Sequence, residues 1–272
     1  MLASFLITFR EGLEAFLLVG IALSYLTKLN AKHFHKYIYL GVAVGFILSL
    51  LVAVVFQLFI DQFSNELYRN YFMAGILIFA TFVLTYMAIW MQKQAKQQTA
   101  QVQKNLTEYV STGNVIGLVL LSTLAVLREG FETILFFSAL MFSAGNNFSQ
   151  EQGILGAILG LGLSFVVVWV LMKGARKVPL AAFFRWTSLL VIIIAAGLLS
   201  SAINMLQATD LISVFYAHIF DVSHILDDRG VFGTFLRALF GYNASPSLFQ
   251  FSTWGLYLVI FIVFWKRSYA KS

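Results

Sequence analysis

The sequence predicts an all-α polytopic membrane protein with seven transmembrane helices, an outside N-terminus, and a 3+3 inverted repeat followed by a seventh helix. Three observations support this fold class. The chain is 60% hydrophobic and 11% charged, whereas a soluble domain carries about 25% charged residues. Its apolar residues gather in runs that are long enough to cross a bilayer. One charged motif occurs in the first of these runs and again in the fourth.

The apolar runs define the expected helices within a single transmembrane domain, residues 1–272. A helix needs roughly 17 or more residues to cross the hydrocarbon core of a bilayer. The runs are Leu2–Leu26, Tyr37–Ile60, Tyr71–Met91, Asn114–Met141, Gly153–Lys173, Trp186–Leu206 and Phe249–Trp265. The first run has no basic segment before it and carries the charged motif, so we expect a retained span rather than a cleaved signal peptide. The polar stretch Gln92–Gln103 is expected to continue the third helix into solvent.

The basic residues predict the orientation. Of the 18 Lys and Arg, 13 fall in the connections and tail on one side of the predicted spans and 3 on the other. The positive-inside rule then places the N-terminus outside and the C-terminus in the cytoplasm. We therefore expect a multi-pass protein of the cytoplasmic membrane. The same distribution accounts for the net charge of +6, so no nucleic-acid partner is expected. The absence of cysteine excludes disulfides and thiolate metal sites.

The motif places charged residues inside apolar runs. Its copies are Arg10-Glu11-Gly12-Leu13-Glu14 and Arg128-Glu129-Gly130-Phe131-Glu132. Each ionisable group near a bilayer centre costs at least about 2.5 kcal/mol on insertion scales. At 100° per residue, the arginine and the two glutamates of a copy share one helix face. That face must point into protein or water.

The two copies reveal an internal repeat. Arg10 and Arg128 lie 118 residues apart, and nearly the same offset carries the second and third runs onto the fifth and sixth. The predicted parts are repeat one (about 1–91), repeat two (about 114–206), an outer connection (207–248) and a seventh helix (249–265). Small-residue pairs recur as Gly41-x3-Gly45 and Gly156-x3-Gly160, which favours close helix approach. The first and fourth runs cross in opposite directions, and inverted repeats with a polar midplane site are typical of transporters.

The motif residues form the predicted metal site. Two arginines against four glutamates leave two negative charges, which a bound cation would compensate. The predicted ligands are Glu11, Glu14, Glu129 and Glu132, supported by Arg10 and Arg128. Because the helices run in opposite directions, Arg10 is expected level with Glu132 and Arg128 level with Glu14, which predicts two ion pairs between the repeats. The alternative is a salt-bridge cluster that only locks the helices together.

The outer connection holds a second candidate, for outer metal capture. Its residues are Asp221, His224, Asp227, Asp228 and Asp210. Asp221 and His224 would share a face if this segment were helical. The alternative is an acidic solvated loop whose side chains cap turns and helices.

With these motifs the sequence resembles the oxidase-dependent iron permease family, also called high-affinity iron permeases, and most closely its bacterial EfeU-type branch. The hallmark is Arg-Glu-x-x-Glu in the first and fourth spans. The resemblance also covers the segments 182–188, 195–198, 220–223, 232–234 and 240–247. Relatives often carry Glu-Ala-Gly after the sixth span, whereas this chain has Gln207-Ala208-Thr209-Asp210. Asp210 is therefore a candidate replacement for that glutamate.

The resemblance implies an iron ion permease of the cytoplasmic membrane, which moves iron inward through the two motifs. Iron would be the transported substrate, with no organic cofactor, and carboxylates suit iron better than soft cuprous ions. The resemblance further implies either ferric iron delivered by an oxidase or ferrous iron oxidised during uptake. Besides the iron ion and the lipid bilayer, the expected partners are extracytoplasmic iron-oxidising or iron-delivering proteins.

Two other functions remain open. A membrane di-iron carboxylate enzyme would use Glu-x-x-His on two helices, but here the second residue is glutamate in both copies and no predicted span contains histidine. A transporter of another divalent metal or of an organic cation would use the same charges. The chain has no Gly-x4-Gly-Lys-Ser/Thr motif, so ATP hydrolysis is not expected. We expect a transporter and not an enzyme.

Overall fold

The computed structural model describes residues 2–62, 65–144, 150–173, 180–209, 219–227 and 230–270. Within these ranges the regular elements are helices. They are α1 (Leu2–Lys28), a 3-10 turn η1 (Lys32–Phe34), α2 (His35–Asp61), α3 (Glu66–Thr112), α4 (Val115–Ala144), α5 (Gln150–Lys173), α6 (Leu180–Ala208), α7 (Val231–Phe240) and α8 (Leu248–Ala270). The predicted all-helical class is confirmed.

Five helices are long and apolar enough to cross a membrane: α2, α3, α5, α6 and α8. Helices α1 and α4 are also long, with 27 and 30 residues, but each carries one copy of the charged motif. The chain is therefore a multi-pass membrane protein. The count of seven spans and the outside N-terminus stay predictions.

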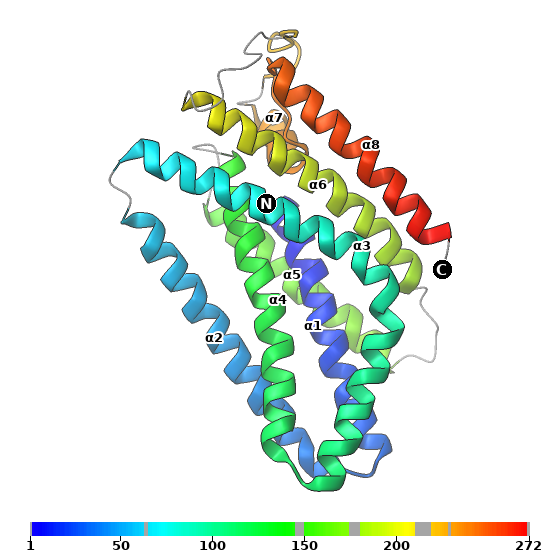
Figure 1. The fold of residues 1–272 in the computed structure, drawn as a ribbon. Helices are drawn as coiled ribbons and strands as arrows, with labels where there is room; N and C mark the ends of the chain where they lie inside the picture. Colours follow the sequence, from blue (N-terminus) through cyan, green and yellow to red (C-terminus); the bar gives the residue numbers. More distant parts are fainter. Residues whose placement is uncertain are drawn as a thin grey trace.

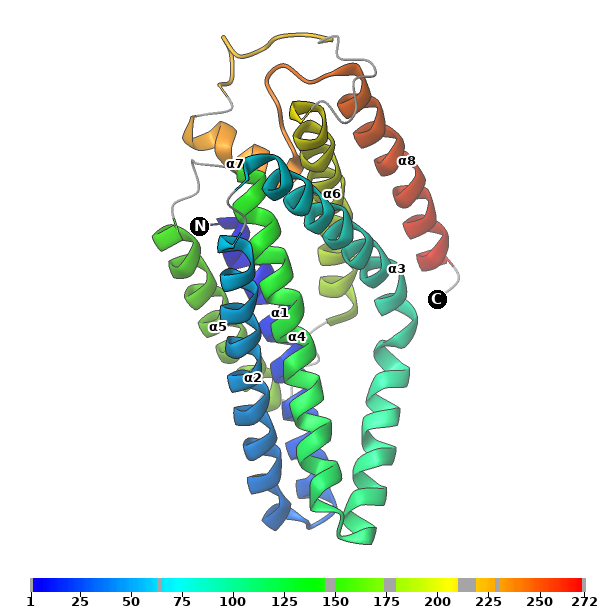
Figure 2. The ribbon, with the colours of Figure 1, turned by 60° about the vertical axis from the view of Figure 1, so that its left-hand side comes forward.

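The helices pack in pairs that link the two predicted repeats. Helix α1 lies along α5, α2 along α4, and α3 along α6, and α1 also contacts α4. In both views the first half of α3 runs obliquely beside α6 and α8, while its second half extends with α1, α2 and α4 toward the opposite end (Figures 1 and 2). The predicted repeat relates α1 to α4, α2 to α5 and α3 to α6. Under this relation the α1–α5 pair is equivalent to the α4–α2 pair. This pairing supports the repeat, which stays a prediction.

Helix α3 is longer than its apolar run. It has 47 residues, or about 70 Å at 1.5 Å per residue, which exceeds a hydrocarbon core of about 30 Å. It begins where the side chain of Asn65 accepts a hydrogen bond from Leu67 N, and it ends at Gly113 in the left-handed conformation. Its last turns reach Leu106, which is buried in one cluster with Leu26 and Leu118. The polar extension therefore continues helix α3, as expected, and carries it to the ends of α1 and α4.

The outer connection contains a helix that the sequence analysis did not predict. Helix α7 ends at Gly241, whose φ is +65°, and the following segment returns toward α6 and α8. A Cβ on Gly197 of α6 would lie 2.5 Å from Gly241 N, so the two backbones touch. Beyond this contact, Ser247 Oγ donates to Gln207 Oε1 at 2.7 Å. Gln207, one residue of the departure from the family pattern, thus ties the connection to α6.

Candidate metal site

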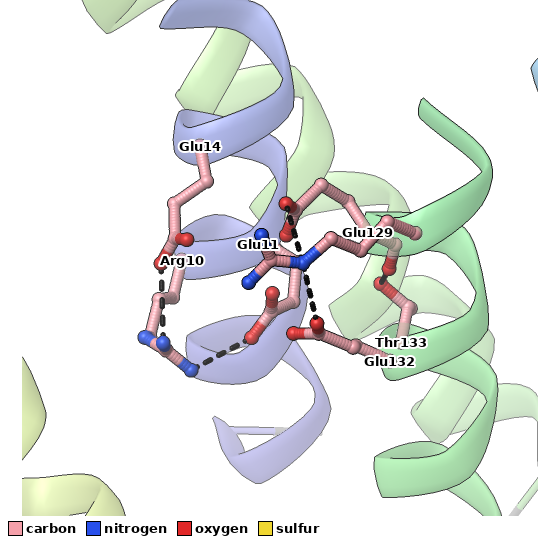
Figure 3. A network of polar contacts seen from close by, with 7 residues as sticks. Arg10, Glu11, Glu14, Glu129, Glu132 and Thr133 are labelled. Atoms are coloured by element: carbon pink, nitrogen blue, oxygen red, sulfur yellow. Dashed lines mark hydrogen bonds and ion pairs between the residues drawn. The ribbon is translucent and has the colours of Figure 1, made fainter. Parts of the chain in front are cut away.

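The two motifs face one another across the contact between α1 and α4 (Figure 3). Both copies lie within long helices, so the i, i+1 and i+4 spacing places their charged groups on one face. Glu11 is only 2% exposed, Glu129 4% and Glu132 7%. The structure therefore brings the four predicted ligands and the two predicted supporting arginines together at the contact between α1 and α4.

Each arginine forms ion pairs with the glutamates of its own motif. Arg10 Nη1 lies 2.8 Å from Glu11 Oε1, and Arg10 Nη2 lies 3.1 Å from Glu14 Oε1. On α4, Arg128 Nε lies 3.0 Å from Glu132 Oε1 and 3.9 Å from Glu129 Oε1. One guanidinium thus holds two carboxylates on α1, and on α4 the stronger contact is with the glutamate one turn further along.

The expected ion pairs between the repeats, Arg10 with Glu132 and Arg128 with Glu14, stay a prediction, and the ion pairs described here lie within each motif. Both described i, i+4 pairs join an arginine to its own helix. The physical reason is local, because a long arginine reaches a carboxylate one turn away on the same helix whatever the relative rotation of the two helices. The motifs still interact electrostatically across the interface, Arg10 with Glu132 and Arg128 with Glu14.

Three of the carboxylates form a cluster with the geometry of a metal site. Glu11, Glu14 and Glu129 each offer one carboxylate oxygen, and these oxygens all lie within 4.8 Å of one another. Buried oxygens without a hydrogen-bond donor occur on Glu11 Oε2, Glu129 Oε2 and Glu132 Oε2. A buried carboxylate oxygen without a donor is costly. A cation placed among these oxygens would supply the missing interaction.

A cavity of about 90 Å³ opens beside the first motif. Arg10 and Glu11 form part of its wall, and the remaining wall is almost entirely apolar, from α1, α3, α4 and α6. Leu84, Phe136 and Val191 are examples of these lining residues. The charged cluster therefore borders a largely apolar cavity.

The candidates for outer metal capture lie apart from this cluster. Asp221, His224 and Asp227 are exposed. Asp221 Oδ1 accepts a hydrogen bond from Ser223 N at 2.9 Å, which is a turn-stabilising contact. Asp210 and Asp228 lie outside the described residues. Among the residues that the structure describes, the motif glutamates are the one acidic group close enough together to hold an ion, and outer capture stays a prediction.

Sequence reasoning missed some of the residues that shape the site. Thr133, next to Glu132, donates its hydroxyl to the backbone oxygen of Glu129 at 2.8 Å. Gly12 and Gly130, the glycines inside the motifs, lie against serines of neighbouring helices. Their position in both copies was a usable signal, since a glycine within a helix costs about 1 kcal/mol relative to alanine unless packing requires it. The cavity wall on α3 and α6 had no comparable signal.

The sequence profile of the family described as "Iron permease FTR1 family" matches residues 1–270. The chain belongs to this family. It is 33% identical over 264 residues to the "Ferrous iron permease EfeU" of Escherichia coli O6:H1, covering 95% of this chain and 93% of that relative. The ferrous iron permease EfeU of Yersinia pestis is also 33% identical, over 95% of this chain and 91% of the relative. No solved structure matches. These names describe a transporter and not an enzyme, in agreement with the sequence analysis.

Proposed function

We propose that this chain moves iron inward across the cytoplasmic membrane through a site that its two Arg-Glu-x-x-Glu motifs form together. One observation carries the proposal: oxygens of Glu11, Glu14 and Glu129 converge within 4.8 Å from two different helices. A structural salt bridge needs no such excess of carboxylates. The family and the relatives named above support iron as the cation.

The charge balance supports a cation of charge two or three. If all four glutamates are ionised, the two arginines leave a formal charge of −2 in a largely buried place. Carboxylates are hard ligands that accept iron in either oxidation state. Glu132 is the proposed fourth ligand, because its Oε2 is buried without a donor. Iron would compete with Arg10 and Arg128 for the oxygens that the guanidinium groups now hold.

We further propose seven spans with an outside N-terminus, which makes α1 and α4 opposite in direction. Lys32, after α1, would be cytoplasmic, and Gln62, after α2, would face outward; both are exposed. The chain has no cysteine, so Lys32→Cys and Gln62→Cys each create one thiol. In intact cells a membrane-impermeant maleimide should label only the Gln62→Cys protein. Labelling of Lys32→Cys without permeabilisation would reverse the orientation.

In this orientation the two arginines would lie on opposite sides of the cluster and differ in exposure. Arg10 lies on the outer side of the cluster with 7% of its side chain exposed, and Arg128 lies on the inner side with 40% exposed. A charged side chain inside a membrane protein turns toward protein or water rather than lipid. Iron would thus leave past Arg128, while the outer side would have to open for entry, as in alternating access.

The partners and the outer surface belong to the same proposal. An extracytoplasmic protein that oxidises or delivers iron would release it near the outer connection, where Asp221 and Asp227 are exposed. Whether these residues collect iron is tested by Asp221→Asn together with Asp227→Asn. The expected result is a loss of uptake at low iron concentration that high concentration restores. Unchanged uptake at both concentrations would remove outer capture from the proposal.

The deciding experiment is uptake of radioactive iron into proteoliposomes that contain only this chain. Ferrous iron kept reduced with ascorbate and ferric iron kept soluble with a weak chelator should be tested separately. Manganese and zinc serve as competitors. Saturable uptake of either iron species, with weak competition, supports the proposal. Uptake no greater than into protein-free liposomes for both species, or preferential transport of manganese, would overturn it.

A further inference from the structure

The glycine inside each motif lies against a serine of the helix packed behind it. A Cβ on Gly12 of α1 would lie 2.3 Å from Ser164 Oγ on α5. A Cβ on Gly130 of α4 would lie 2.1 Å from Ser49 Oγ on α2. A Cβ essentially never comes within 3.0 Å of a heavy atom of a residue to which it is not linked in the chain. At Gly130 the Cβ of Ser49 would also lie only 2.6 Å away, so no larger residue fits the observed packing. At Gly12 the Cβ of Ser164 would lie 3.1 Å away, so a larger residue fits only if the Ser164 hydroxyl leaves its hydrogen bond to Leu161 O.

The contact repeats in both halves of the molecule. Gly12 and Gly130 hold the same place in the two motifs, and α1–α5 and α4–α2 are the helix pairs that the predicted repeat relates to each other. Close approaches from the partner helix accompany each contact. A Cβ on Gly160 of α5 would lie 2.5 Å from the backbone oxygen of Phe5, and one on Gly45 of α2 would lie 2.8 Å from that of Thr123.

The contact is one of size rather than of hydrogen bonding. Ser164 Oγ donates to Leu161 O at 2.7 Å, and Ser49 Oγ donates to Gly45 O at 2.8 Å, so each hydroxyl bonds to its own helix. Ser164 is fully buried and Ser49 is 7% exposed. What each serine presents to the motif helix is therefore a fixed, close-packed surface.

The position of the glycine on its helix links this packing to the carboxylates. Gly12 lies roughly 100° from Glu11 and 160° from Glu14 around the helix axis, on the face opposite the metal cluster. A carboxylate lies about 6 Å from the axis, so a rotation of only 10° moves it by about 1 Å. A support at the back of the helix thus determines where the carboxylates at the front converge.

We propose that Gly12 and Gly130 are positioning residues of the iron site, each fixing the rotation of its motif helix by close packing against Ser164 or Ser49. The inference rests on the carboxylate site of the proposed function. It assigns to the motif a second role, beyond its charges, in which the glycine is required because of a residue on another helix.

The test is a set of alanine variants with matched rescue. Gly12→Ala and Gly130→Ala should raise the iron concentration for half-maximal uptake about tenfold or more, since a displacement of 1 Å can cost up to about a hundredfold. Ser164→Gly removes the Oγ and Cβ that oppose the new methyl group, so Gly12→Ala/Ser164→Gly should recover most of the loss. Ser49→Gly should rescue Gly130→Ala in the same way. Crossed doubles, such as Gly12→Ala/Ser49→Gly, should show no recovery.

Glycines with open space provide the controls. A Cβ on Gly162 of α5 or Gly75 of α3 would meet nothing within 4 Å, so Gly162→Ala and Gly75→Ala test glycine replacement alone and should transport normally. The protein amount in the membrane and the midpoint of thermal unfolding are measured for every variant. A purely structural contact would lower these two quantities and leave the half-saturating iron concentration of the surviving protein unchanged. That result would overturn the inference.

Two further sets of variants test the inference if an alanine variant does not accumulate. If Gly12→Ala does not accumulate, Ser164→Gly alone, which removes the support without adding bulk, should still raise the half-saturating concentration about threefold. An unchanged value in that variant overturns the inference. Glu11→Gln and Glu129→Gln are measured alongside. Normal uptake by the glutamine variants overturns the proposed site itself, whereas inactive glutamine variants with fully active alanine variants overturn only the positioning role.

Discussion

The two motifs have nearly the same sequence and lie in different surroundings. On α1, Arg10 has 7% of its side chain exposed and contacts two glutamates within 3.1 Å. On α4, Arg128 has 40% of its side chain exposed, with Glu132 at 3.0 Å and Glu129 at 3.9 Å. A repeated sequence therefore does not impose a symmetric site. The state of the transport cycle would be visible as a difference between the copies in the exposure and contacts of the arginine.

The largest effect should come from removing charge from either copy. Glu11→Gln and Glu129→Gln keep the side-chain volume and remove a buried ligand of the proposed site, so each should reduce iron uptake to background. Glu66→Gln and Glu108→Gln, at exposed positions of α3, are the matched controls and should transport normally. Both copies contribute to one cluster, so the loss should be equally complete in each. A variant of one copy that retains full transport would show that the site is built from the other copy alone.

Replacing the arginines should separate the copies. Lysine offers a point charge where the planar guanidinium holds two carboxylates. At Arg10 the contacts are buried, and a charged hydrogen bond there is worth about 1.5–3 kcal/mol, so Arg10→Lys should slow uptake by roughly tenfold or more. An ion pair exposed to solvent is worth about 0.2–1 kcal/mol, so Arg128→Lys should slow it less than about fivefold.

The measurement is the initial rate of iron uptake per amount of inserted protein. Lys104→Arg, in the polar extension of α3, is a control for substitution between the two basic residues. Equal losses at both arginines would contradict the idea that burial distinguishes the copies. If Arg128→Lys slows iron uptake more than Arg10→Lys does, the closed side of the site lies at the α4 copy.

Much of this arrangement follows from the sequence because it depends on local patterns. Apolar length located α2 and α4 to within three residues at each end, since a bilayer requires a fixed length of helix. Helical periodicity placed the charges of each motif on one face. The pairing of Arg10 with Glu14 was also available from local geometry, but the inverted directions of the helices favoured pairs between the repeats.

The remaining features depend on the relative rotation and height of helices, which no single segment encodes. The contacts of Gly12 with Ser164 and of Gly130 with Ser49 join residues more than 80 positions apart. Helix α7 was missed because its ten residues lie in a connection whose apolar positions are interrupted by glycine and arginine. Its anchoring to α6 depends on the close approach of Gly197 to Gly241. The sequence around these two glycines does not predict that contact.

The smallest expected effect concerns a polar side chain beside the site that the copies do not share. Thr133 follows Glu132 on α4, and the equivalent position on α1 is Ala15. The Thr133 hydroxyl donates to the backbone oxygen of Glu129 at 2.8 Å, so it is engaged within its own helix. Thr133→Ala makes the copies alike at this position and should change the uptake rate by less than about twofold, as expected for a hydroxyl that does not bind the ion.

Ala15→Thr is the reciprocal variant, and its hydroxyl can bond the backbone oxygen of Glu11 in the same way. Both variants are measured for the half-saturating iron concentration and for the maximal rate. If Thr133→Ala instead raises the half-saturating concentration strongly, the hydroxyl must turn from Glu129 to the ion during transport. The site would then contain an oxygen ligand that only the α4 copy supplies, and the asymmetry between the copies would extend to the iron ligands as well as to the burial of the arginines.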